Sequence, residues 1–201
     1  MTRDQGIRAR QRAQTRRTLL REGGRAFAEL GYAGVGLAGI VQAAGVTKGA
    51  FYHHFASKTE LFHAVLEEAQ EEVGRRVAAA ADVHDDPWDR LVAGCGEFLA
   101  AATDPDLQRI MLVDGPAVLG WAQWRALDEA ASGRHLADAL TELIDAGSIA
   151  PQPVEPLVHL LSGAMNEAAL WLASTPGPGE RLDQTRAALA GLLGALRADA
   201  G

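Results

Sequence analysis

Apolar residues recur at steps of three and four positions through most of the chain, and runs of alternating apolar and polar residues are absent. This spacing is typical of helices that bury one face, so the sequence predicts an all-α fold. Glycine and proline interrupt the pattern at intervals and divide it into about nine helices.

The amino-terminal part of the chain is predicted to form a small helical domain over residues 11–56. The preceding residues 1–10 carry no apolar stripe, and we expect them to be a flexible basic arm. Gly45 is suited to end a helix and Thr47 to cap the next one. Three helices are expected in this domain, at residues 11–30, 37–44 and 48–54.

Residues 57–201 are predicted to form a second helical domain. Its first helix, residues 57–80, begins at the capping box of Ser57 and Glu60 and links the two domains. Pro87 and Pro105 each mark the start of a later helix. The remaining helices are expected at residues 116–146, with a candidate break near 132–133, and at 154–173 and 180–198.

Charge is divided sharply between the two ends of the chain. Residues 1–60 contain ten Lys/Arg and four Asp/Glu, a net charge of +6, whereas the other 141 residues have a net charge of −13. A basic domain beside an acidic one is the distribution expected when one end approaches a polyanion. A solvated basic face is the alternative explanation, so charge alone does not decide the function.

Several functional classes lack their sequence signals. The chain has no P-loop, dinucleotide glycine fingerprint or nucleophile elbow, which argues against an enzyme and against a cofactor. His53 and His54 would point about 100° apart on a helix, so no metal site is expected. Cys95 is the single cysteine and is predicted to be a buried apolar residue. The absence of a signal peptide or membrane span favours a cytoplasmic protein.

Residues 36–58 have the organisation of a helix-turn-helix, in which the second helix enters the major groove of DNA. The start of that helix offers a hydroxyl, backbone amides and a lysine to the groove, and later side chains can donate to phosphates. Lys58, at the start of the following helix, is also expected to meet a phosphate. The predicted DNA contacts are Thr47, Lys48, Gly49, Ala50, Tyr52, His53, His54 and Lys58.

These residues resemble the TetR family of bacterial transcriptional regulators. The resemblance covers about 45 residues and rests on the spacing of Phe27, Gly31-Tyr32, Ile40, Ala44-Gly45-Val46-Thr47, Tyr52, His54-Phe55, Lys58 and Leu61. It implies a homodimer that binds a palindromic operator in double-stranded DNA and is released by a small molecule in the carboxyl-terminal domain. Gly36, Ala38 and Gly39 depart from the usual polar residues, so few base contacts are expected from the helix at 37–44.

The carboxyl-terminal domain offers candidates for a dimer interface and for an effector pocket. Apolar stripes on the last two helices fit either a four-helix dimer interface or closure of the monomer core, and the resemblance favours the dimer. Its residues are Leu157, Leu161, Ala164, Ala168, Leu182, Leu189, Leu192 and Leu196. All four tryptophans lie in this domain, which suggests a pocket for a small apolar or aromatic effector. The candidates are Trp88, Phe98, Met111, Trp121, Trp124, His159, Asn166, Glu167 and Trp171.

Two other functional classes remain as alternatives at this point. One is a small all-helical enzyme, and the other is a helical adaptor with no role on DNA. Both leave the charge division and the capped third helix without an explanation. The sequence therefore favours a ligand-released repressor.

Overall fold

The computed structural model describes residues 3–174 and 178–198, which contain no β-strand and form eleven α-helices and two π-helical segments, η1 and η2. The all-α prediction is confirmed. The elements are α1 (Arg3–Gly34), α2 (Leu37–Ala43), α3 (Lys48–Tyr52), α4 (Lys58–Ala81), α5 (Pro87–Ala102), α6 (Pro105–Gln108), η1 (Arg109–Asp114), α7 (Gly115–Leu119), α8 (Trp121–Asp128), η2 (Glu129–Gly133), α9 (Arg134–Asp145), α10 (Val154–Ala173) and α11 (Pro178–Gly194).

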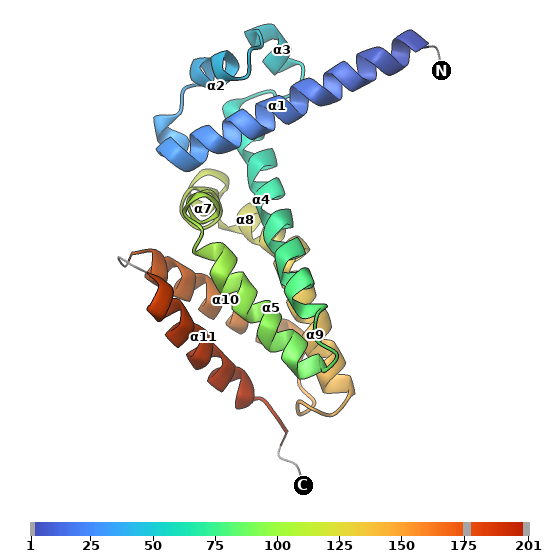
Figure 1. Cartoon of the computed structure of the whole chain (residues 1–201), viewed down its shortest axis with the longest axis vertical. Helices are drawn as coiled ribbons and strands as arrows, with labels where there is room; N and C mark the ends of the chain where they lie inside the picture. The colour runs from blue at the N-terminus through green and yellow to red at the C-terminus, as the bar shows by residue number, and fades with distance from the viewer. Residues whose placement is uncertain (1–2, 175–177, 199–201) are drawn as a thin grey trace.

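The helices are arranged in two groups joined by α4 (Figure 1). Helices α1, α2 and α3 form one group, and α4 runs from it into a bundle that contains α5 and the later helices. Helix α5 packs against α4, and α9, α10 and α11 pack against α5 on its other sides. Each helix of the described residues is too short or too polar to cross a membrane.

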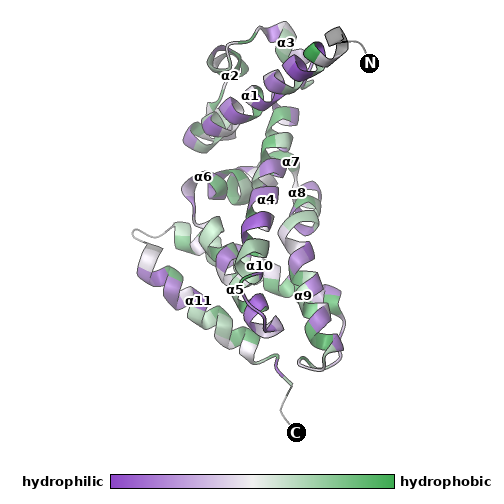
Figure 2. Cartoon of the chain, turned by 45° about the vertical axis from the view of Figure 1, so that its right-hand side comes forward, coloured by the Kyte–Doolittle hydropathy of each residue, from purple (hydrophilic) through white to green (hydrophobic). Residues whose placement is uncertain are grey.

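The amino-terminal arm is helical from Arg3 onward, which corrects the prediction of a flexible segment over residues 1–10. Residues 1 and 2 lie outside the described residues. Arginine, glutamine and alanine have high helix propensity, and extending an existing helix requires no new nucleation. The result is a helix whose first turns project beyond the rest of the bundle in Figure 1 and are largely hydrophilic in Figure 2.

An aromatic cluster joins α1 to α4 at the base of the group formed by α1, α2 and α3. The rings of Phe27 and Phe62 meet edge to face with centroids 5.1 Å apart, and the Tyr32 ring lies 5.2 Å from Phe62. The Tyr32 hydroxyl is 2.8 Å from the hydroxyl oxygen of Thr59. Burial of such rings is a large apolar contribution to stability, and here it fixes α1 on the first turns of α4.

The predicted helix starts at Ser57 and Pro87 form as expected. The Ser57 hydroxyl oxygen accepts from the Glu60 amide at 3.1 Å, while the Glu60 carboxylate accepts from the amide of Ala56. The Asp86 carboxylate accepts from the amides of Trp88 and Asp89 ahead of α5. These side chains satisfy amides that have no partner inside the helix.

The predicted helix over residues 116–146 is interrupted more often than expected. It begins as α7, turns at Gly120, where φ is +79°, and continues as α8, η2 and α9. The expected break near Ser132-Gly133 falls within η2. A side chain at Gly115 would meet Trp124 Cδ1 at 2.8 Å, so the close approach of Trp124 requires glycine there. Tertiary contacts of this kind override the helical periodicity of the segment.

Gly31 kinks α1 near its end, where the helix meets the carboxyl-terminal domain. Its φ is +71°, a conformation that glycine adopts without steric cost. An added Cβ would also lie 2.9 Å from Nη2 and 3.0 Å from Nε of Arg109. The backbone conformation therefore requires a glycine at this position, and an added side chain would also displace the guanidinium group of Arg109.

Replacing Gly31 by alanine is expected to lower the free energy of unfolding by about 1–3 kcal/mol, because it adds backbone strain and displaces Arg109. Urea unfolding followed by circular dichroism measures this change. Gly39→Ala is the matched control, because Gly39 lies inside α2 and an added Cβ there meets nothing within 4 Å. A Gly31→Ala protein as stable as the Gly39→Ala protein would contradict the assignment.

Candidate nucleic-acid interface and effector cavity

The turn between α2 and α3 has the geometry of a helix-turn-helix. Gly45 has φ +64°, and its amide donates to the carbonyl of Gln42 at 3.1 Å, while the Val46 amide donates to Val41 at 3.1 Å. This pair of bonds is a Schellman ending, which uses a left-handed residue to stop a helix. The Thr47 hydroxyl then accepts from the Ala50 amide at 3.1 Å and caps α3.

Most of the predicted contact residues in and around α3 lie on an exposed surface. Thr47, Lys48, Gly49, Tyr52 and His53 are exposed, whereas Ala50 and His54 are half-buried. Phe51, on the opposite face, is fully buried and holds α3 on the domain. The helix therefore presents its amino-terminal residues outward, as insertion into a groove requires.

Two arginines of α1 extend this surface beyond α3, and sequence reasoning did not single them out. The guanidinium of Arg16 lies over the Phe55 ring at 5.4 Å, and both Arg12 and Arg16 lie close enough to His54 to affect its charge. Partial burial lowers the pKa of His54, and Arg12, Arg16 and His53 lower it further. The sequence did contain a signal for this pair, because residues four positions apart in a helix, such as Arg12 and Arg16, lie on the same face.

Lys58 does not lie free for a phosphate, which corrects its predicted role. Its ammonium group donates to the carbonyl oxygens of Tyr32 at 2.8 Å and Val35 at 2.9 Å. The same group lies 4.0 Å from the centroid of the Tyr32 ring. The end of a helix exposes carbonyl oxygens that attract a cation, so Lys58 joins α4 to the end of α1.

Segment η1 provides a second connection between the group of α1, α2 and α3 and the bundle. The Asp114 carboxylate accepts from the Tyr32 amide at 2.8 Å, and the Arg109 guanidinium donates to the Glu29 carbonyl at 3.4 Å. Arg109 also packs against Gly31. The end of α1 is thus held by Lys58 from α4 and by both ends of η1.

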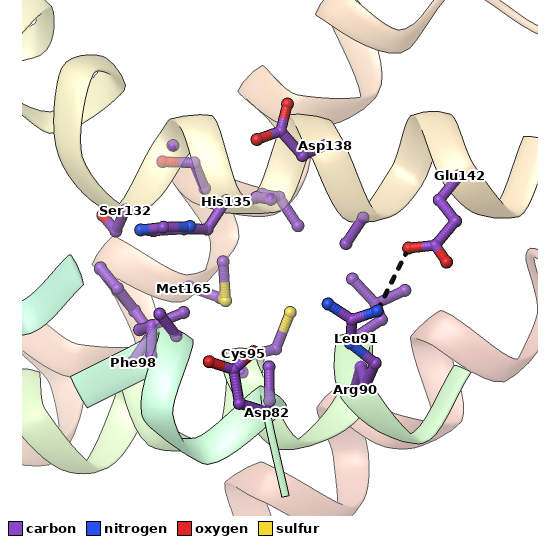
Figure 3. A pocket seen from close by; sticks show the side chains of 18 of the residues that line it. Asp82, Arg90, Leu91, Cys95, Phe98, Ser132, His135, Asp138, Glu142 and Met165 are labelled. Atoms are coloured by element: carbon purple, nitrogen blue, oxygen red, sulfur yellow. Dashed lines mark ion pairs between the residues drawn. The ribbon is translucent and has the colours of Figure 1, made fainter. Parts of the chain in front are cut away.

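A cavity of about 190 Å³ lies in the bundle between α4, α5, η2, α9 and α10. Figure 3 shows Ser132, His135, Asp138 and Glu142 on one wall and Phe98, Cys95, Leu91 and Arg90 on the other, with the His135 imidazole pointing inward. Arg90 and Glu142 form an ion pair of 3.6 Å at its edge. Burial raises the pKa of Cys95 to about 12, so this thiol is an unreactive apolar group.

The predicted pocket residues do not gather in that cavity. Phe98 lines it, but Trp88 and Met111 are buried in the core and line neither this cavity nor the groove described next. The cavity is lined instead by residues such as Cys95, Leu136 and Met165. Their spacing along the helices is that of ordinary core residues, so the sequence does not distinguish them as pocket residues. Trp171 lies half-exposed on α10, with the Arg181 guanidinium 5.9 Å from its ring centroid.

The other predicted pocket residues line a separate groove of about 380 Å³ between α8 and α10. They are Trp121, Trp124, His159, Asn166 and Glu167. Sequence reasoning thus brought together five side chains that are neighbours in space, although three of them are on α10 and two on α8.

A buried polar network separates the cavity from the groove. Asp128 accepts from the Arg125 guanidinium at 3.0 Å and from the hydroxyls of Ser162 at 3.1 Å and Ser132 at 3.3 Å. Burial raises the pKa of Asp128, while Arg125 and the two hydroxyls favour its charged form. Ser132 and Ser162 line the cavity, whereas Arg125 lines the groove.

The predicted dimer residues are divided between the core and the surface. Leu157 and Leu189 are buried within the chain, so their side chains close the monomer core, which corrects their assignment to an interface. Leu161, Ala168, Leu182 and Leu196 are half-buried. Ala164 and Leu192 are exposed, and Leu160 and Trp171 are exposed beside them. The exposed apolar face of α10 is therefore turned by about one residue from the predicted stripe, whereas Ala164 and Leu192 lie on the surface as the stripe predicted.

In the part of the chain that the structure describes, no group of three or more His, Cys, Asp or Glu side chains is placed to hold a metal ion. His53 and His54 lie within the basic surface of α1 and α3.

Comparisons with known proteins agree with this architecture. Residues 19–65 match the model of the tetR family of bacterial regulatory proteins, and residues 88–196 match the model of the tetracyclin repressor-like carboxyl-terminal domain. The chain belongs to the TetR family, and it is a transcriptional regulator with a helix-turn-helix DNA-binding domain. The family consists of transcriptional regulators and not of enzymes.

Individual relatives support the same conclusion. A TetR-family regulator from Pectobacterium atrosepticum is 34% identical, with 99% of each chain covered and a TM-score of 0.77. An HTH-type transcriptional repressor of Mycobacterium tuberculosis is 33% identical over 118 residues, which are 55% of this chain and 58% of that protein. The Tn10 TetC protein of Escherichia coli is 27% identical over 68% of this chain and 69% of its own length. Regulators of the family bind DNA and small-molecule effectors and form dimers.

Lys48 and Lys58 are expected to respond differently to the same substitution. Lys48→Met removes an exposed cation at the start of α3 and should reduce the salt slope of DNA binding by about one unit at unchanged stability. Lys58→Met leaves two carbonyl groups without their donor and should lower the free energy of unfolding by about 1.5–3 kcal/mol. Gel shifts across a salt series and urea unfolding measure the two effects. A stable Lys58→Met protein with a reduced salt slope would restore the phosphate role.

Proposed function

We propose that the protein is a homodimeric repressor that binds a palindromic operator and is released by a small molecule held in the bundle cavity. The continuity of α4 carries this proposal. Its first turns hold the DNA-binding group through Lys58 and Phe62, and Val77, Ala78 and Ala81 near its other end line the cavity. A ligand that displaces the cavity wall therefore acts on the helix that positions α3. The protein acts in the cytoplasm, where bacterial DNA lies.

The contacts of η1 give the bundle a second hold on the DNA-binding group. Asp114 and Arg109 contact the end of α1, and α1 carries the basic surface that extends from α3. Rotation of α4 relative to η1 would strain these bonds and move α1 with α3. In a dimer this motion changes the distance between two recognition helices, which must match about 34 Å for successive major grooves.

The ligand must bind the released conformation more tightly than the DNA-bound one, because otherwise it cannot shift the equilibrium. The cavity walls come from separate helices, so the distances between these walls differ between the released and the DNA-bound conformation. Its lining combines apolar side chains with His135 and two serine hydroxyls, which suits a small molecule with an apolar body and a hydrogen-bonding group.

Narrowing the cavity tests the effector site. Ala139 lines it and is half-buried, so Ala139→Leu should fill part of the volume. We expect operator binding within about twofold of the parent protein and at least tenfold weaker release by any compound that releases the parent. Compounds are found by loss of a fluorescence-anisotropy signal from labelled operator. Ala146→Leu, at an exposed site, is the control. A compound that releases both variants from the operator equally well would show that the effector does not bind in this cavity.

The homodimer is proposed to form through the exposed apolar face of α10 and α11. Leu160 is 72% exposed and Leu192 is 63% exposed, with Ala164 and Trp171 on the same face of α10. Such a contiguous apolar face is typical of an interface, and two copies of this helix pair form an isologous four-helix contact.

Leu160→Glu is expected to convert the dimer into monomers, because it places a charge on each side of the symmetric interface. Sedimentation equilibrium measures the mass, and weaker operator binding should accompany the loss of dimer. Val83→Glu is the control, since Val83 is 78% exposed in the turn after α4. A Leu160→Glu protein that remains dimeric would move the interface to another face.

A further inference from the structure

The amino-terminal turns of α1 stand largely free of the rest of the protein. Within residues 7–17 every residue is exposed except Thr15, which is half-buried, and the first buried side chain of the helix is that of Leu19. A helix without a buried face gains little stability from tertiary packing. About three turns of α1 therefore present their side chains to the surroundings and add little to the core.

This free part of α1 carries charge of one sign. Residues 5–21 contain six arginines and no acidic residue. Arg8, Arg12 and Arg16 follow one another at four-residue spacing, and like charges at that spacing repel each other along a helix. An anionic surface relieves this repulsion, and the polyanion that a regulator of this family meets is DNA.

The arginine row lies on the side of α1 that faces the end of α3. The guanidinium group of Arg16 lies 5.4 Å from the centroid of the Phe55 ring, shortly after α3. Both Arg12 and Arg16 lie close enough to His54 to affect its charge. One face of the free helix thus continues the exposed surface of α3.

The helical geometry places the other arginines on separate faces. Residues four positions apart are about 40° apart around the helix, so Arg8 continues the row of Arg12 and Arg16 toward the amino terminus. Arg10 and Arg17 are about 140–160° away from Arg12 around the same helix. They therefore share its charge and exposure but point away from the row.

The row and α3 also lie at the same end of the molecule. In both Figure 1 and Figure 2 the first turns of α1 and helix α3 are at the end farthest from the carboxyl terminus. Arg8 is about 12 Å from Arg16 along the helix, because each residue adds about 1.5 Å. This length corresponds to roughly three or four base pairs of a duplex at about 3.4 Å each.

We propose that the row of Arg8, Arg12 and Arg16 binds backbone phosphates of the DNA that flanks the site read by α3. The guanidinium groups donate to phosphate oxygens, and the contact lengthens the bound DNA by roughly three or four base pairs for each protomer. Phosphates are the same in every sequence, so the contact adds affinity without base preference. This inference rests on DNA binding by the helix-turn-helix, and it is independent of the effector cavity.

Two double variants of the full-length protein test the row. Arg12→Gln/Arg16→Gln removes two charges beside α3, and Arg10→Gln/Arg17→Gln removes two charges from the opposite face as the matched control. Fluorescence anisotropy across a salt series measures binding to a labelled mixed-sequence duplex of about four helical turns. The first variant should lower the salt slope by about 0.9 for each lost phosphate contact, whereas the control should keep the slope of the parent protein.

The position of the contact is tested on an operator enriched from a library of random duplexes. Lengthening each end of this operator by about four base pairs should tighten binding of the parent and the control about tenfold more than binding of Arg12→Gln/Arg16→Gln. Exchanging A·T for G·C pairs in the flanks should change the affinity by less than about twofold. A stronger dependence on flank sequence would assign the arginines to the minor groove and overturn the phosphate contact.

The single variant Arg12→Gln separates a lost contact from a folding defect. Arg16 packs on Phe55, whereas Arg12 is exposed, and glutamine has a helix propensity similar to that of arginine. Its urea midpoint should equal that of the parent protein, while its salt slope should fall about half as far as in Arg12→Gln/Arg16→Gln.

Two results would overturn the proposal. Equal salt slopes of the two double variants would show that positive charge attracts DNA from any face of α1. A smaller mass of Arg12→Gln/Arg16→Gln than of the parent protein, in sedimentation at low ionic strength without DNA, would place the row against the acidic domain of a second copy.

Discussion

The ammonium group of Lys58 binds the end of α1 from the first turn of α4, and the position of the DNA-binding helices depends on this contact. It satisfies the carbonyls of Tyr32 and Val35 and lies over the Tyr32 ring. Helices α2 and α3 are too short to be stable alone, so they require a fixed platform. Lys58 and the aromatic cluster beneath it make α1 and α4 that platform. A residue that the motif suggested for DNA contact thus supports the surface that DNA meets.

The same junction explains how the two halves of the protein can communicate. The end of α1 is held by α4 on one side and by Asp114 and Arg109 of η1 on the other. Both α4 and the segment after η1 continue into the bundle, where a cavity and a groove lie on either side of the Arg125–Asp128 network. In the proposed mechanism, changes in the bundle reach α3 through these two connections. The kink of α1 at Gly31 lies beside the residues that both connections contact.

The helix ends around the motif could be predicted from the sequence, because they depend on short-range hydrogen bonds. Gly45, Thr47, Ser57 and Asp86 end or cap helices through bonds to their immediate neighbours, so their effect follows from the sequence nearby. The long segment after Asp114 was harder to predict. Its interruptions at Gly120 and η2 depend on contacts such as that between Gly115 and Trp124, and the spacing of apolar residues does not reveal such contacts.

The sequence by itself determined the all-α class, the helix-turn-helix and the division of charge, because each depends on residue type and short-range spacing. Tertiary structure alone decided which polar side chains are free and which are already bonded. It turned Lys58 toward carbonyls, buried Leu157 and Leu189 while leaving Leu160 exposed, and grouped Arg12 and Arg16 with His54. It also separated Phe98 from the tryptophans of the groove. Spacing along a helix defines its faces, but only packing of the helices decides which face meets solvent.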